Sequence, residues 1–255
     1  WKLSETDGAQ YADAAVAILN DWAKTCTGFI VNDKGEFIDP NEFLIFIQVH
    51  QIANAAEIMR SYSGWQEADF VKFKAWIADV FYPHITKFLS THNGNECALH
   101  YWLNWDLSAM TALLSIGILA DDNFKINEAI QYFKFGIGSG NIGNGVPFIH
   151  LDPDSNEMLG QCQESGRDQG HATLCVSLLG AFCQMAKNVG EDLFIFDDGR
   201  ALAMCEYVAK YNIGGAETGS SSASWKMTGF RYTDNDLPYT TYTNSSGSWD
   251  TISSQ

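Results

Sequence analysis

The chain has 255 residues, of which 46% are hydrophobic and 13% aromatic, enough to bury the core of one large domain or at most two. Its 31 acidic and 15 basic side chains give a net charge of −16 at pH 7. Binding to nucleic acid or to an anionic membrane needs a basic face, so neither is expected, and an anionic ligand would need a locally basic cleft. No apolar run reaches the length of about 18 residues that predicts a transmembrane helix.

Helical periodicity, with apolar residues at i, i+3, i+4 and i+7, extends to about residue 212. The predicted helices are Ala9–Ala23, Glu42–Tyr62, Glu67–Leu89, Tyr101–Leu119, Asn123–Phe135, Gln169–Val189 and Asp198–Tyr211. Strand-like alternation is scarce. Successive helix pairs of similar length predict an all-α fold, an (α/α) toroid or incomplete barrel of helical hairpins, formed by a single domain over residues 1–255.

Two predicted connections are longer than usual, Gly136–Asp168 and the tail Gly214–Gln255. Long loops on a rigid helical scaffold often carry binding residues. We therefore expect both loops to line the central cleft.

The first candidate motif is QESGRDQGHATL, which begins at Gln163 and leads into a predicted helix. It gathers Glu164, Arg167, Asp168 and His171, interleaved with two glycines that allow a ligand to approach the backbone closely. Arg167 and His171 are one helical turn apart and would face the same side. The structural alternative is a charge cluster that caps the helix and complements its dipole.

The second candidate motif is HYWLNWDL, which begins at His100. Asn104 stands between Trp102 and Trp105 at the start of an otherwise apolar helix. Aromatic faces stack on sugar rings, and an amide can bond hydroxyl or carboxylate oxygens, so the run suits carbohydrate binding. A tryptophan pair in the core with a satisfied amide would explain it equally well. His150, in FIHLDPD, is a weaker candidate.

The spacing of the residues does not match the motifs of several other kinds of catalytic or metal site. The sequence has no CxxC, HExxH, GxSxG or GxxxxGK[ST] motif, and DPDSNE lacks the glycine and spaced glutamate of a calcium loop. No metal site is therefore expected. A glycoside hydrolase needs two carboxyl groups in a cleft, and Glu164, Asp168, Asp106 and Asp152 are available for that role.

The two motifs, together with CEYVAKYN on a scaffold of helical pairs, resemble the alginate-lyase-type polysaccharide lyases with an α/α toroid fold. The resemblance extends from about Tyr11 to Asn244. It implies cleavage of a uronic-acid polysaccharide, of the alginate or glucuronan type, by β-elimination without a cofactor. The implied partner is the anionic polysaccharide, and the implied location is secreted or periplasmic.

Carried over by position, Asn104 matches the family's asparagine, Arg167 its basic helper and His171 its histidine. The candidates for the family's tyrosine are Tyr239, Tyr242 and Tyr101. The resemblance and the aromatic run imply further substrate-binding residues, namely His150, Trp102, Trp105, Tyr101, His100, Glu164 and Gln163. Relatives are expected to carry another helix with an arginine and a tyrosine after this tail.

The implied mechanism explains the residue types. A uronate C5 proton is too weakly acidic to remove unless the charge that develops on the carboxylate is neutralised, which Asn104 and Arg167 would do. A neutral imidazole at His171 could take the C5 proton. A tyrosine would protonate the departing O4, or serve as the base for the other epimer. A non-catalytic carbohydrate-binding protein with the same aromatic cleft is the other alternative.

Overall fold

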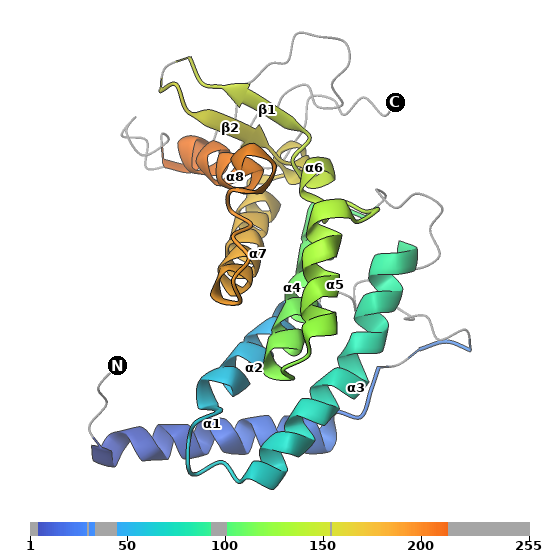
Figure 1. Ribbon diagram of the computed structural model, residues 1–255, viewed down its shortest axis with the longest axis vertical. Helices are drawn as coiled ribbons and strands as arrows, with labels where there is room; N and C mark the ends of the chain where they lie inside the picture. The colour runs from blue at the N-terminus through green and yellow to red at the C-terminus, as the bar shows by residue number, and fades with distance from the viewer. Residues whose placement is uncertain (1–4, 30, 34–44, 93–100, 154, 214–255) are drawn as a thin grey trace. The chain divides into compact units, whose positions relative to one another are not determined.

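The computed structural model of the chain describes residues 5–29, 31–33, 45–92, 101–153 and 155–213 (Figure 1). This part of the protein is mostly helical, as predicted, and each predicted helix has a counterpart in it. The toroidal arrangement and its central cleft stay predictions. No helix in the described ranges is both long and apolar enough for a bilayer span.

The chain divides into two compact units. The first comprises Trp1–Cys97 and Ser108–Gln131, and the second comprises Ala98–Leu107 and Tyr132–Gln255. Two of the three boundaries between the units therefore fall within α4 (Leu103–Leu119) and α5 (Asn123–Phe135).

In the first unit, α1 (Glu5–Thr25), α2 (Phe46–Met59) and α3 (Glu67–Thr91) pack against one another. The apolar residues of α3 recur every three or four positions and so form one stripe along the helix. The buried members of this stripe are Phe70, Phe73, Ile77, Phe81, Ile85, Phe88 and Leu89. Their burial against the neighbouring helices stabilises the unit.

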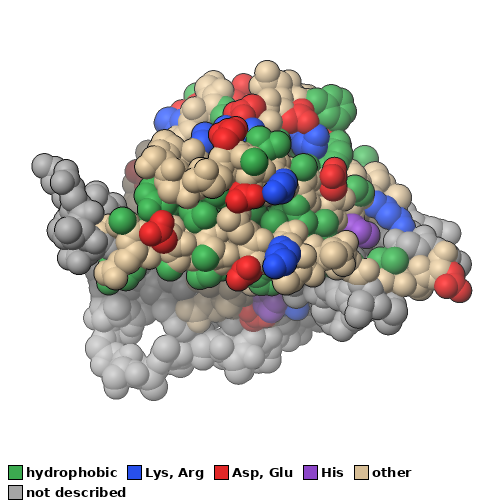
Figure 2. All heavy atoms as spheres, turned by 90° about the horizontal axis from the view of Figure 1, so that it is seen from below, with side chains coloured by type: hydrophobic (Ala, Val, Ile, Leu, Met, Phe, Trp, Pro, Cys, Tyr) green, Lys and Arg blue, Asp and Glu red, His purple; other side chains and the backbone are tan. Residues whose placement is uncertain are grey.

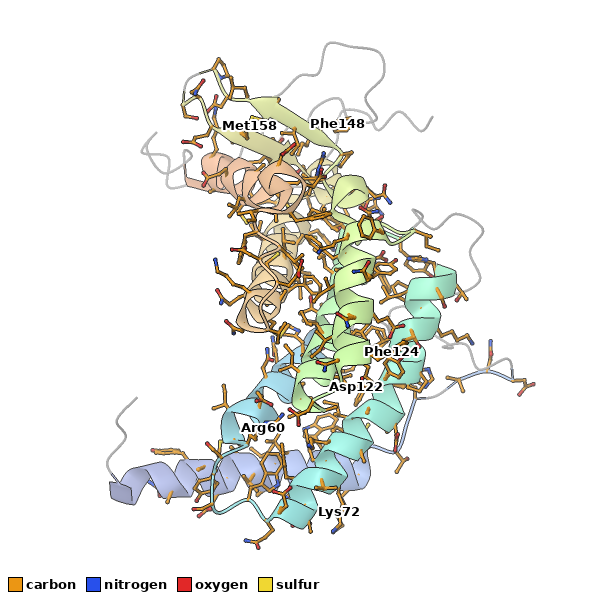
Figure 3. All side chains as sticks on the ribbon, viewed as in Figure 1. Arg60, Lys72, Asp122, Phe124, Phe148 and Met158 are labelled. Atoms are coloured by element: carbon orange, nitrogen blue, oxygen red, sulfur yellow. The ribbon has the colours of Figure 1, made fainter. Side chains whose placement is uncertain are left out.

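Arg60, just after α2, fixes the turn between α4 and α5 (Figure 3). Its Nη2 donates to the carbonyl oxygen of Leu119 at 2.7 Å, and its Nη1 donates to Asp121 Oδ2 at 2.9 Å. The last carbonyls of a helix lack partners within the helix, and a cation is favourable at that end. Arg60 therefore caps the carboxyl end of α4.

Helix α4 is buried along almost its whole length. Its sequence is apolar on nearly all sides, which is typical of a helix that crosses a protein interior. Asn104 and Asp106, in its first turn, are polar and yet buried, with exposed fractions of 1% and 0%. Buried polar side chains require partners, so these two residues mark the end of α4 at which the site is built.

In the second unit, α7 (Gln169–Asn188) packs against α8 (Phe196–Ile213). Phe182 of α7 stacks on Phe133 of α5, with their ring centroids 5.4 Å apart. A short helix, α6 (Ile142–Gly145), also contacts α8. These contacts enclose the core of the unit.

The predicted connection Gly136–Asp168 is more structured than the sequence indicated. It contains α6, an antiparallel hairpin of β1 (Phe148–Leu151) and β2 (Met158–Gln161), and a 3-10 turn, η3 (Gln163–Gly166). Figure 3 labels Phe148 and Met158, the first residues of the two strands. Phe148 pairs with Gln161, and Leu151 with Met158.

The prediction of an irregular loop was wrong here because four-residue strands are too short to show an alternating pattern. The hairpin depends instead on tertiary packing, since β2 lies against α8 (Figure 1). Gly160 allows this approach: a Cβ atom there would lie 2.8 Å from the main-chain nitrogen of Met204.

The face drawn in Figure 2 shows acidic and basic side chains interspersed with apolar ones. On the described part of this face the basic side chains form no continuous patch.

Candidate functional site

The start of α4 and the η3 turn meet through Asn104 and Glu164. Asn104 donates twice to Glu164 Oε1, from the side-chain Nδ2 at 2.6 Å and from the main-chain nitrogen at 3.2 Å. The first N–H groups of a helix have no partner within it, so Glu164 also caps the amino end of α4 from another segment of the chain. The two candidate motifs of the sequence are thus joined directly.

Glu164 is an unusual carboxyl group because none of it is exposed. Burial raises its pKa above the ordinary value, and this effect outweighs the opposing hydrogen bond from Asn104 and the positive charges of Arg167 and His171. Its Oε2 accepts no hydrogen bond from the described residues and lies 3.7 Å from Arg167 Nη1. Glu164 is therefore a buried acid that holds its proton more tightly than usual.

Arg167 lies between this acid and an aromatic ring. Its guanidinium carbon is 5.5 Å from the centre of the Trp102 ring, within the range of a cation–π contact. Its Nε is 3.9 Å from Asp168 Oδ2, and about a third of its side chain is exposed. Arg167 can therefore present a positive charge at the site while Trp102 holds the plane of its guanidinium.

His171 lies in the first turn of α7 and is held by Asp168. Asp168 Oδ1 accepts the main-chain N–H of His171 at 2.8 Å, and Asp168 Oδ2 lies 2.6 Å from His171 Nδ1. Asp168 is the N-cap of α7, so the capping interpretation of the motif is correct for this residue. The side chain of His171 is 34% exposed, which leaves its ring open to a ligand.

The segment that carries Asn104 is anchored by a second buried carboxylate, Asp106. Its Oδ2 accepts the hydroxyl of Tyr132 at 2.7 Å and the main-chain N–H of Gly140 at 2.8 Å. Burial, reinforced by the charge of Asp106, raises the pKa of Tyr132, so this hydroxyl stays protonated. Asp106 is therefore committed to holding the loop after α5.

Two aromatic candidates lie beside this anchor. The rings of Tyr101 and Trp105 make an edge contact, with their centroids 5.2 Å apart, and both side chains are partly exposed. Ser139 donates to the carbonyl oxygen of Tyr101 at 2.9 Å. The predicted aromatic residues Tyr101, Trp102 and Trp105 thus all flank Asn104 at the start of α4.

His150 lies on β1, where its ring contacts Tyr207 of α8 with centroids 6.1 Å apart. Burial lowers the pKa of His150 to about 4; Asp152 opposes this shift and Lys210 adds to it. Lys210 Nζ lies 2.7 Å from Asp152 Oδ1. His150 is thus a neutral side chain of the hairpin, and its predicted role in substrate binding stays a prediction.

Gln163, the first residue of η3, has a buried Oε1 with no hydrogen-bond partner in the described part of the chain. His100, Tyr239 and Tyr242 lie outside the described residues. Within the described ranges, no group of three or more His, Cys, Asp or Glu side chains could hold a metal ion.

The sequence analysis placed Asp168 in the first motif and among the available carboxyl groups, but it did not predict its contact with the His171 ring. A signal for it exists, because an N-cap residue and the third residue of a helix commonly reach each other through both main chain and side chain. The pattern Asp168-x-x-His171 therefore predicts the observed pair. No local pattern predicts the contact between Asn104 and Glu164, which are 60 positions apart.

Comparison with known proteins identifies the family of the chain. The family model described as alginate lyase matches residues 2–218. No curated protein and no solved structure gives a significant match. The matched range contains both candidate motifs and ends before Tyr239 and Tyr242. Because the family model covers most of the sequence, the chain belongs to the alginate lyase family.

Proposed function

We propose that this protein is a polysaccharide lyase that cleaves a uronic-acid polymer, of the alginate or glucuronan type, by β-elimination. Membership in the alginate lyase family supports polysaccharide lyase activity in general and an anionic polysaccharide as the substrate. The observation that carries the finer proposal is the convergence of Asn104, Glu164 and Arg167. A secreted or periplasmic location is proposed with it, since such polymers lie outside the cytoplasm.

These three residues suit a uronate carboxylate. The amide of Asn104 has two N–H groups and uses one on Glu164, so the second can donate to the substrate. Arg167 supplies a positive charge, and the buried Glu164 holds the Asn104 amide in place through Oε1. Together they neutralise the charge that builds up on the carboxylate as C5 loses its proton, and the preorganised donors lower the barrier.

Proton transfer is assigned to His171 and to a tyrosine. The C5–H bond breaks and its proton passes to the imidazole of His171, while the electron pair forms the C4–C5 double bond and the C4–O4 bond breaks. A tyrosine hydroxyl then gives a proton to O4. Tyr101, Tyr239 and Tyr242 remain the candidates for this donor, and they can be separated by phenylalanine variants.

A glycoside hydrolase is the second candidate, because a buried acid with a raised pKa is also what a hydrolase needs as its general acid. The other available carboxylates have different tasks. Asp106 binds Tyr132 and Gly140, and Asp168 caps α7. Asp152 pairs with Lys210, so none of these three carboxylates is left as a second acid beside Glu164. Within the described residues, this favours the lyase.

The test is a product assay on polymannuronate, polyguluronate and glucuronan, with an uncharged polysaccharide as control. A lyase generates the near-ultraviolet absorbance of an unsaturated uronate from at least one polyuronate and none from the control. New reducing ends without that absorbance would establish the hydrolase instead. Binding without either signal, measured by calorimetry on the same polymers, would establish a carbohydrate-binding protein.

A further inference from the structure

The contact between Asp168 and His171 is more than a helix cap requires. Capping needs one side-chain oxygen on a main-chain N–H, and Asp168 Oδ1 provides it at 2.8 Å. The second oxygen, Oδ2, lies 2.6 Å from Nδ1 of the His171 ring. One carboxylate thus fixes both the backbone and the ring of the same residue.

This geometry determines which ring nitrogen carries the proton. An ionised carboxylate can only accept hydrogen bonds, so the nitrogen that faces it must be N–H. Arg167 Nε lies 3.9 Å from Asp168 Oδ2 and places a positive charge beside that oxygen. In neutral His171 the proton therefore stays on Nδ1, and Nε2 keeps its lone pair.

We propose that Asp168 is a positioning residue for the elimination: it holds His171 in the Nδ1–H form and leaves Nε2 as the atom that accepts the C5 proton. The inference rests on the proposed function, because it assumes that His171 takes this proton. When Nε2 is protonated the ring becomes a cation, and Asp168 then faces a positive charge that it stabilises. Asp168 itself touches neither the substrate nor the transferred proton.

The decisive variant is Asp168→Asn. Asparagine caps helices as well as aspartate, so its Oδ1 can still accept the His171 main-chain N–H. Its Nδ2 group is a donor, however, and it would face Nδ1 of the ring. The ring would then accept at Nδ1 and carry its proton on Nε2, which removes the lone pair needed for catalysis.

Two readouts separate positioning from a structural role. In protein labelled with ¹⁵N-histidine, the ring nitrogen shifts should report Nδ1–H for His171 in the wild type and Nε2–H in Asp168→Asn. The kcat of the variant should fall about 10²- to 10⁴-fold, the range for loss of a general base. Its KM and melting temperature should change little, because the cap and the carboxylate-binding groups remain.

Asp122→Asn is the matched control. Asp122 precedes α5 and accepts the main-chain N–H groups of Phe124 and Lys125, but its other oxygen faces the Lys125 ammonium rather than an imidazole. This variant should keep the wild-type kcat. Asp168→Ser, which can cap but offers the ring no carboxylate, should lose less activity than Asp168→Asn because it imposes no wrong tautomer.

The outcomes are distinguishable from failure of the proposed function. Absence of lyase activity in the wild type on every polyuronate would refute both the function and the catalytic role of Asp168. An Nε2–H signal in an active wild type would overturn the inference alone. So would an Asp168→Asn variant that keeps normal kcat, or one that loses kcat while its His171 ring stays in the Nδ1–H form.

Discussion

Asn104 and Glu164 share one oxygen atom: Glu164 Oε1 accepts both the side-chain amide and the main-chain N–H of Asn104. The same carboxyl group therefore orients the Asn104 amide and caps the amino end of α4, the helix that carries it. A change at either residue alters a helix terminus as well as a binding group. Stability and activity must accordingly be measured together on every variant of this pair.

Asn104→Ala and His171→Ala should abolish most turnover and leave the fold intact. Loss of a donor to a developing oxyanion typically costs about 10²–10³-fold in rate, and loss of a general base about 10²–10⁴-fold. Asn104→Ala should also lower stability by about 1–3 kcal/mol, because Glu164 loses a buried donor. Thermal unfolding and the unsaturated-product assay on each variant check this. A lowered melting temperature with near-normal specific activity in both variants would show that the two residues have only a structural role.

Glu164→Gln tests whether the site needs only a neutral hydrogen-bonding side chain at this position or an acid that can give up its proton. Glutamine can accept from Asn104 through Oε1 and donate through Nε2, so the lyase should keep most of its kcat. Glu164→Ala leaves the buried Asn104 amide without the acceptor that orients it, at a cost of about 1–3 kcal/mol, which corresponds to a loss of roughly 10- to 10²-fold in rate. A hydrolase that needs the Glu164 proton would lose its activity in both variants.

The pH dependence of stability should also report Glu164. Because its pKa in the folded protein is raised above 4.5, its contribution to the free energy of unfolding is fully present below pH 4.5 and is lost as the pH rises through the raised value. Glu164→Gln should therefore gain stability relative to the wild type as the pH increases. Urea unfolding of both proteins at pH 5 and pH 8 measures this difference, and a constant difference would contradict it.

His150 should act in the opposite pH direction. Its pKa in the folded protein is about 4, below the ordinary 6.5, so its contribution is present above pH 6.5 and is lost as the pH falls toward 4. His150→Phe should remove this part of the acid sensitivity. The check is urea unfolding of the wild type and of His150→Phe at pH 7 and pH 4.5. An unchanged acid sensitivity in His150→Phe would contradict the assignment.

Tyr132→Phe provides a structural control for the site. The substitution removes the hydroxyl that donates to Asp106 and leaves that buried carboxylate with one fewer donor. Stability should fall by about 1–3 kcal/mol, while kcat of the molecules that remain folded should stay close to normal. Denaturant unfolding and a rate corrected for the folded fraction test this. A large loss of kcat would mean that Tyr132 takes part in proton transfer.

The helices were predictable because their signals are local. The bounds of α5, Asn123–Phe135, agree with its apolar period, and α7 begins at Gln169, directly after its N-cap Asp168. The β1–β2 hairpin was missed because its stability comes from α8, whose packing leaves no period in four-residue strands.

The members of the site were easier to predict than their relationships. Both motifs were visible because unusual residues cluster in each of them. The shared oxygen of Glu164 and its raised pKa depend on burial and on a contact across 60 positions, which no window of the sequence contains. That one of Tyr101, Tyr239 and Tyr242 gives a proton to the departing O4 stays a prediction.

The Asp106 carboxylate has a further consequence for how a ligand is received. By accepting from Tyr132 at the end of α5 and from Gly140 in the following loop, it orders that loop in the free protein. The amide hydrogen of Gly140 should consequently exchange with solvent as slowly as those of the neighbouring helices, although it lies outside any helix or strand. A polymer chain that reaches the aromatic rings beside Asn104 would then meet a surface already in its final conformation, and association would lose little entropy to loop folding.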